Sequence, residues 1–330
     1  MNAIMKKVSS WLLMAVYVLV CGEISIRIIS AFVTVYSIEM LEYAKELKIK
    51  SPIPEISHEH RPNANARLMG VEVALNSLGH RSARLQVPKG ENERRIHVLG
   101  SSITLGWGVE AEEGFVGRVE KRLNREKGAR NGHRYTAINA GIGNYNTYYE
   151  AELFKRQVDV TKPDVVVLQY YINDAEQNPK GEDNPILRYS LFAAFIYQHI
   201  KTLTAVSTKT LAEHYRDLYL EGAPSWKKAK AAVREIKAIT DKRAIPFVVL
   251  LVPELHDLSD DGPYPPIYEK IGAAFGKMGI HMINPLSRFQ AAFSDDPSRA
   301  WAAQNDPHPN ASAHKVIADA LFDYLAPRID

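Results

Sequence analysis

The 330-residue chain lacks the features that mark several common classes of protein. Cys21 is its only cysteine, which excludes an internal disulfide and a zinc site built on cysteine ligands. The formal net charge is only +3, and no basic stripe interleaved with aromatic residues indicates binding to nucleic acid. Glycines at 100, 106 and 108 fit neither the dinucleotide fingerprint Gly-x-Gly-x-x-Gly nor the phosphate-binding loop. The overall composition, 46% hydrophobic and 24% charged, is typical of a globular protein.

The N-terminus carries a long apolar segment that follows Lys6 and Lys7. Residues 8–22 would reach only about 22 Å as a helix, which is less than a hydrocarbon core of about 30 Å. Extension to Arg27 supplies the missing length, and Glu23 precedes Arg27 in the order that favours an i,i+4 ion pair. The pattern predicts a signal anchor, a transmembrane helix within residues 1–36.

The two lysines predict the orientation of this anchor. Because lysines before a span stay in the cytoplasm, the body of the chain would lie outside, at the periplasmic face of a bacterial inner membrane. Two alternatives remain open. One is a cleaved signal peptide, although no Ala-x-Ala site follows the apolar run, and the other is a buried helix of a soluble protein.

Residues 37–93 predict an irregular juxtamembrane extension, because proline, asparagine and arginine are interleaved there with short apolar runs. Strands are expected only around residues 68–75 and 84–87. The triplet at 58–60, His-Glu-His, could suggest a metal site. Adjacent ligands in a loop without further donors make a poor cage, so we expect a solvated turn.

From residue 94 to the end of the chain, apolar runs alternate with amphipathic segments. Five runs are predicted as strands: residues 96–99, 135–139, 164–171, 247–252 and 281–286. Helices are predicted around residues 112–125, 147–158 and 311–325. Strands that alternate with helices predict an α/β domain over residues 94–330, a doubly wound parallel sheet with its reactive edge at the carboxyl ends of the strands.

The connection between the third and fourth strands is too long for a plain crossover, and we predict a helical insertion over about 176–222. The whole connection, residues 175–245, holds a charged turn at 180–183 and an apolar, aromatic helix from 186 to about 206, with further helices around 210–220 and 225–243. Arg188, His199 and Lys201 flank the apolar core of the first helix too closely for a membrane span. Packing on the sheet is the favoured role, and a cover over the site or a face for a membrane partner stays open.

Ser102 is the candidate nucleophile, because it follows the first strand at the start of a helix, where open α/β sheets carry out chemistry. The ordinary alternative for such a serine is a helix cap. His308 would supply the base, and Asp306 would orient the imidazole. Both lie in the loop before the last helix.

An acyl oxyanion also needs preorganised donors. The loops after the second and third strands carry candidates on the same sheet edge: the amides of Gly143 and Asn144 and the side chain of Asn173. The amide of Ser102 would add another. Asn173 could instead cap a helix.

These four motifs, Gly-x-Ser, the small-residue turn, Asn-Asp and Asp-x-His-Pro, resemble in their order the SGNH (GDSL-type) hydrolases. The resemblance covers residues 94–328, and the run Gly-Trp-Gly-Val at 106–109 adds to it. It implies a flavodoxin-like sheet, acyl-ester chemistry, and no metal or organic cofactor. The segment at 76–81, Asn-Ser-Leu-Gly-His-Arg, is similar to the lead-in of membrane-anchored members encoded with polysaccharide machinery.

The chain departs from the family pattern at four positions. Ser101 stands where relatives carry an acid, Asn144 replaces a glycine of the second motif, and Tyr171 replaces a glycine of the third. Asp306 precedes His308 by two residues rather than the commoner three, as in polysaccharide acetyl-transferring relatives. Asparagine tolerates unusual backbone angles, which suits it to the glycine position.

Two classes of function are therefore expected. The first is a membrane-anchored serine esterase that acts on O-acyl groups, chiefly O-acetyl, of an envelope or exported glycan; a sugar hydroxyl as acceptor would make it a polysaccharide O-acetyltransferase. The second is a non-catalytic partner of a membrane acyltransferase or polysaccharide export complex, with a decayed site. Neither class involves nucleic acid.

Overall fold

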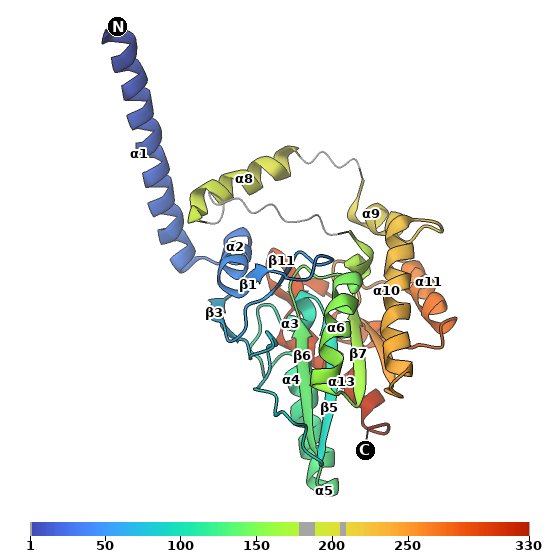
Figure 1. The fold of residues 1–330 in the computed structure, drawn as a ribbon. Helices are drawn as coiled ribbons and strands as arrows, with labels where there is room; N and C mark the ends of the chain where they lie inside the picture. Colours follow the sequence, from blue (N-terminus) through green and yellow to red (C-terminus); the bar gives the residue numbers. More distant parts are fainter. Residues whose placement is uncertain (1, 178–188, 205–208, 330) are drawn as a thin grey trace.

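The structure is a computed structural model that describes residues 2–177, 189–204 and 209–329. A long helix, α1 (Asn2–Phe32), projects from an α/β domain (Figure 1). Its segment Lys7–Phe32 is long and apolar enough to cross a membrane, a property that a signal sequence near the N-terminus would share. The predicted ion pair forms in the C-terminal part of this helix, where Arg27 lies 2.6 Å from Glu23.

The core of the domain is a five-stranded parallel sheet in the order β6-β5-β7-β8-β9. The strands are β5 (Glu93–Gly100), β6 (Arg134–Gly141), β7 (Val165–Tyr170), β8 (Phe247–Leu251) and β9 (His281–Ile283). This confirms the predicted doubly wound α/β fold. Gly100 is paired with Gly141, so β5 and β6 end at the same level, and the loops that follow them begin side by side.

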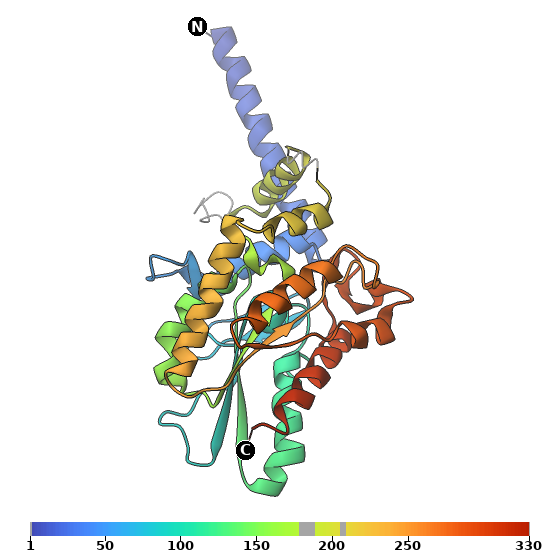
Figure 2. The same ribbon diagram turned by 90° about the vertical axis from the view of Figure 1, so that its right-hand side faces the viewer.

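Helices cover both faces of the sheet (Figure 2). β7 shows why: Val165 and Val167 enter one core, while Val166 and Leu168 enter the other, so that every residue of the strand is buried. The first core is shared with α4 (Phe115–Leu123), α12 (Leu286–Phe293) and α13 (Ala311–Leu325). The second core is shared with α6 (Thr147–Thr161), α10 (Pro224–Asp241) and α11 (Pro265–Gly276).

The segment between α1 and the sheet is more ordered than its composition predicted. It forms helix α2 (Tyr36–Leu47), the antiparallel pair β1 (Lys48–Lys50) and β2 (His58–His60), and the hairpin β3 (Asn65–Leu68) and β4 (Val71–Ala74). The strand expected at 84–87 does not form. The solvated turn expected at 58–60 is also wrong, because these residues pair with β1, and the His60 ring is buried between Tyr43 and Gly79.

The insertion after β7 contains α8 (Leu191–Thr204) and α9 (Leu211–Leu218), followed by α10. The favoured packing of the first helix on the sheet is wrong: α8 packs on α1 and α2 instead. Its first turn is held by Glu23 of α1, and Leu191 contacts the apolar side chains of Ile26 and Ile38. The charged turn expected at 180–183 and Arg188 lie outside the described residues.

Candidate active site

Gly100 makes the turn that presents Ser102. Its φ is +158°, and a Cβ atom there would stand 2.1 Å from the Thr104 hydroxyl oxygen and 2.7 Å from the Gln169 amide oxygen. Any other residue would therefore push these buried groups apart. The chain turns sharply from β5 into α3 (Ser102–Leu105), which places the Ser102 hydroxyl at the first turn of a short helix.

The structure brings three of the predicted residues together. Ser102 Oγ lies 2.8 Å from His308 Nε2, and His308 Nδ1 lies 2.5 Å from Asp306 Oδ1. The last two residues belong to β11 (Asp306–Pro309), which pairs with β10 (Trp301–Ala303) in a hairpin. A carboxylate only accepts hydrogen bonds, so we assign the imidazole proton to Nδ1 and leave Nε2 to accept from the serine.

Asp306 is held in place by three donors. Its Oδ1 accepts from the ring and from the backbone amide of His308, the latter at 3.1 Å, while Oδ2 accepts from Trp107 Nε1 at 3.0 Å. Burial by itself would raise the pKa of Asp306, but the hydrogen bonds from His308 and Trp107 outweigh it, and the pKa lies below its ordinary value. The carboxyl group therefore stays ionised beside the imidazole.

Trp107 and Tyr36 were not foreseen as parts of this site. The Tyr36 ring lies 6.2 Å from the His308 ring, nearly parallel to it, and meets the Trp107 ring edge-on at 6.2 Å. Burial, together with the charge of Asp306, raises the pKa of Tyr36 to about 12. The run 106–109 contributed to the family resemblance, but no local pattern reveals the acceptor of the indole or the neighbour of a tyrosine 272 positions before His308.

The predicted oxyanion loop is shaped by the N-terminal segment. The Gly143 amide donates to the Tyr43 hydroxyl at 2.7 Å. The single proton of this amide is thus engaged by the tyrosine in this structure, and the role of Gly143 as an oxyanion donor stays a prediction. Asn144 adopts the left-handed conformation expected of it, with φ at +67°, and its side-chain oxygen accepts from Lys48 Nζ at 2.7 Å. Burial lowers the pKa of Lys48 to about 7.

Asn173 lies at the same edge of the sheet, in the single turn η2 (Ile172–Ala175) after β7. Its side chain is half-buried. Asp174 caps this turn by accepting from the Tyr171 amide at 2.7 Å, and Asn146 donates to the carbonyl of Glu176 at 2.7 Å. The loops after β6 and β7 are thus tied to each other beside Ser102's helix.

A second carboxylate–imidazole pair follows β8, and the sequence did not lead us to it. The Glu254 carboxylate accepts from Nδ1 of the His256 ring at 2.5 Å and from the Tyr171 hydroxyl. Tyr171, which occupies a glycine position of the family motif, thus directs its hydroxyl to the β8 loop. The His256 ring lies 5.1 Å from that of Trp301, whose strand β10 pairs with the strand of His308.

Arg81 supports the helix that carries the serine. Its buried guanidinium donates to the carbonyls of Leu105 at 3.1 Å and Gly106 at 2.8 Å, and to that of Glu72 at 2.6 Å. The segment 76–81 therefore binds the carbonyl end of α3, where backbone acceptors have no partners within the helix.

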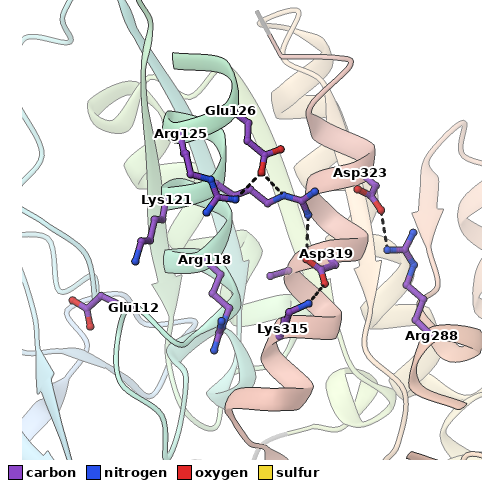
Figure 3. Close-up of a pocket in the computed structure, with 11 residues that line it drawn as sticks. Glu112, Arg118, Lys121, Arg125, Glu126, Arg288, Lys315, Asp319 and Asp323 are labelled. Atoms are coloured by element: carbon purple, nitrogen blue, oxygen red, sulfur yellow. Dashed lines mark hydrogen bonds and ion pairs between the residues drawn. The ribbon is translucent and has the colours of Figure 1, made fainter. Parts of the chain in front are cut away.

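A separate hollow of about 650 Å³ lies between α4 and α13 (Figure 3). Its charged side chains pair with one another: Arg122 bridges Glu126 and Asp319, each at 3.1 Å, and Arg288 binds Asp323 at 2.9 Å. None of its lining residues belongs to the serine site. Within the described ranges, no group of three His, Cys, Asp or Glu side chains could hold a metal ion.

Comparison with known proteins gives one family match. The model of the "GDSL-like Lipase/Acylhydrolase family" matches residues 98–316. No curated protein matches the chain.

Solved structures with a similar trace include LAE5, an alpha/beta hydrolase enzyme from the metagenome of Lake Arreo (17% identity, 71% of this chain, 95% of that one, TM-score 0.45). They also include the psychrotrophic esterase EstA of Pseudoalteromonas sp. (16% identity, 71% of this chain, 97% of that one, TM-score 0.44). A third is the acetylxylan esterase Axe2 of Geobacillus stearothermophilus (15% identity, 70% of this chain, 93% of that one, TM-score 0.45). At these sequence identities and TM-scores, the substrates of these proteins are not transferred to this chain.

Proposed function

Since the chain belongs to the GDSL-like lipase/acylhydrolase (SGNH) family, we propose that it is a membrane-anchored serine esterase that removes O-acyl groups, chiefly acetyl, from an envelope or exported glycan. The observation that carries the esterase assignment is the unbroken hydrogen-bond chain from Ser102 through His308 to Asp306. The choice of a glycan as substrate rests on two points: the similarity of segment 76–81 to family members encoded with polysaccharide machinery, and the proposed anchor, which would expose the site to the periplasm.

In the first half of the proposed reaction, Ser102 Oγ attacks the acyl carbon while its proton passes to Nε2 of His308. Asp306 stabilises the imidazolium that forms, because its ionised carboxylate already accepts from Nδ1. The carbonyl π electrons move to oxygen, and we assign stabilisation of that oxyanion to the amides of Ser102 and Asn144 and the side chain of Asn173. The carbon–oxygen bond to the sugar then breaks, and the sugar oxygen takes the proton from His308.

In the second half, a water molecule attacks the acyl-enzyme and gives a proton to His308. The carboxylic acid leaves as Ser102 recovers that proton, so the enzyme returns to its starting state. A sugar hydroxyl in place of this water would transfer the acyl group instead. Every step uses the chain's own side chains and amides.

We assign residues 1–36 to the anchor and residues 94–330 to the hydrolase domain, with the insertion at about 176–222. Residues 37–93 join them. With Glu23 of α1 bound to Ser190 Oγ and the Phe192 amide, cleavage after the apolar run would remove a partner of the folded domain. This favours a retained anchor over a cleaved signal peptide.

The test is turnover of p-nitrophenyl acetate and labelling by a fluorophosphonate, using the purified full chain in detergent. We expect both in the parent chain, loss of both in Ser102→Ala, and retention of both in Ser101→Ala, which changes the neighbouring serine. The outcome that sinks the esterase is an unlabelled parent chain with native folding, which would favour the non-catalytic partner. Acetylated and deacetylated oligosaccharides, assayed for acetate release and acetyl uptake, then distinguish hydrolysis from transfer.

A further inference from the structure

Helix α8 lies across the foot of α1, where the apolar helix meets the folded domain (Figures 1 and 2). The Glu23 carboxylate of α1 accepts from Ser190 Oγ at 2.9 Å and from the amides of Leu191 at 3.3 Å and Phe192 at 3.0 Å. A carboxylate at the start of a helix satisfies free amides and interacts favourably with the helix dipole. The contact fixes the direction of α8 relative to α1.

The side of α8 that faces the protein is apolar, as expected of a docked helix. Leu191 is buried with Ile26 of α1 and Ile38 of α2, and the ring of Phe192 lies against Gly22. These contacts use only part of the helix surface.

The opposite side of α8 is apolar as well. Ala193, Ile196, Tyr197 and Ile200 follow the spacing i, i+3, i+4, i+7, which places them on one face of the helix. Ile196, Tyr197 and Ile200 are 40%, 43% and 54% exposed. A helix that is apolar on two opposite sides requires an apolar environment on both, and the described residues provide one of them, at the side of α8 that faces α1 and α2.

The height of α8 along α1 indicates what covers this outer face. From Val8, the first apolar residue after the lysines, to Glu23 the helix rises about 22 Å. In a hydrocarbon core of about 30 Å, this places Glu23 and the start of α8 about 8 Å inside the outer boundary. Interfacial helices bury their apolar face about 5–10 Å into this region. The ten-residue apolar segment Leu191–Ile200 reaches only about 15 Å and is too short to span.

We propose that α8 is an interfacial helix whose outer face, Ala193, Ile196, Tyr197 and Ile200, lies in the outer leaflet of the lipid bilayer beside α1. The inference rests on the proposed membrane anchor and goes beyond it, because it adds a second contact with lipid. One helix leaves a domain free to tilt and rotate about the span. Two contacts in different directions hold the domain in one orientation on the membrane.

This orientation determines where the substrate is met. Tyr36 follows the end of α1 by four residues, which reach at most about 14 Å. Its ring lies 6.2 Å from that of His308. The reactive serine is thereby kept close to the membrane surface, so the substrate class is an acylated glycan that is itself held at that surface, by a lipid carrier or as it emerges from a membrane complex.

The test measures lipid contact at three single cysteines in the full chain, each placed in a Cys21→Ser background. Val18→Cys reports the anchor, Tyr197→Cys reports the outer face of α8, and Ala129→Cys reports α5 (Ala129–Asn131), at the end of the domain opposite α1 (Figure 1). Each is labelled with an environment-sensitive fluorophore. The protein is reconstituted in vesicles of phosphatidylethanolamine and phosphatidylglycerol, with or without a doxyl-labelled phospholipid as quencher.

We expect quenching at positions 18 and 197 to exceed that at 129 severalfold. Quenching at 18 with a value at 197 equal to that at 129 would overturn the inference, leave the anchor intact and point to a protein partner on this face. Absence of quenching at 18 would overturn the anchor and the inference with it. In a second set labelled at 197, Ile196→Glu/Ile200→Glu should reduce quenching to the level of 129, whereas Ile196→Leu/Ile200→Leu should preserve it.

Discussion

Replacement of Tyr43 by phenylalanine tests whether the N-terminal segment supports the catalytic site. The Tyr43 hydroxyl accepts from the Gly143 amide at 2.7 Å and lies 2.7 Å from Nε2 of His60. The other ring nitrogen of His60 lies 2.8 Å from the carbonyl of Gly79, which can only accept. His60 therefore carries its proton on Nδ1, and Nε2 accepts from the tyrosine. One hydroxyl thus satisfies a donor and an acceptor that are both buried.

The expected cost follows from the two groups that Tyr43→Phe leaves without a partner. Each buried polar group that loses its hydrogen bond costs about 1–3 kcal/mol. Because the variant no longer buries a hydroxyl, we expect a loss of about 2–5 kcal/mol in the free energy of unfolding. At about 2–4 °C per kcal/mol for large domains, the melting temperature should fall by roughly 5–15 °C.

Activity should fall as well, because the Gly143–Asn144 turn loses its anchor. Loss of a whole oxyanion donor costs about 10²–10³ in kcat, and a loosened donor should cost less, about tenfold. The assays are thermal unfolding followed by tryptophan fluorescence in detergent and turnover of p-nitrophenyl acetate at a temperature where the variant is folded.

The matched control is Tyr36→Phe, which removes a hydroxyl from a tyrosine whose described contacts are made by its ring. It should change the free energy of unfolding by no more than about 0.5 kcal/mol. Equal melting temperatures and equal kcat for Tyr43→Phe and the parent would refute the reasoning, since the hydroxyl would then be supporting nothing.

Two further predictions concern the surroundings of the site. Trp107→Phe keeps an aromatic ring but removes the hydrogen-bond donor to Asp306. Hydrogen bonds to charged groups contribute about 1.5–3 kcal/mol. We therefore expect kcat to fall at least roughly tenfold and KM to change little in steady-state assays. Burial lowers the pKa of His80 from 6.5 to about 4, so the unfolded chain takes up this proton first and stability declines as pH falls through that range. His80→Gln should reduce the pH slope of the unfolding free energy by about 1.4 kcal/mol per pH unit, and an unchanged slope would contradict the assignment.

The sheet and the proximity of Ser102, His308 and Asp306 were predictable because both follow from short-range patterns. A strand such as Val165–Tyr170 is recognised by its apolar run, and parallel strands bring their carboxyl ends to one edge, so residues that follow different strands meet without any knowledge of their distances.

The contacts that the sequence did not reveal join residues that lie far apart in the chain, and no periodic pattern marks these residues. The position of Gly143 in the chain predicts its amide as an oxyanion donor, but does not reveal that this amide donates to the hydroxyl of a tyrosine a hundred residues earlier. His60 looked solvated because its neighbours are polar, yet its environment comes from Tyr43 and Gly79. Likewise, the sequence pattern of α8 predicts a helix, but it does not reveal that the helix binds Glu23 of α1 and packs on the apolar side chains of α1 and α2. Pairings of this kind have no period that a linear pattern could show.

These unforeseen contacts share one origin. The family match begins at residue 98 and contains Ser102, Asp306 and His308, to which we assign the roles of nucleophile, acid and base. Tyr36 stacks on the imidazole of His308, Tyr43 accepts from the Gly143 amide, and Arg81 donates to the carbonyl end of α3. All three residues precede residue 98. Ser102 forms its 2.8 Å hydrogen bond with His308 even though Ser101 stands where relatives carry an acid. Residues outside the family motif support the helix and the imidazole that make this contact. A domain boundary at residue 93 therefore does not separate the site from the N-terminal segment, because Tyr36, Tyr43 and Arg81 precede that boundary and contact His308, Gly143 and the carbonyl end of α3.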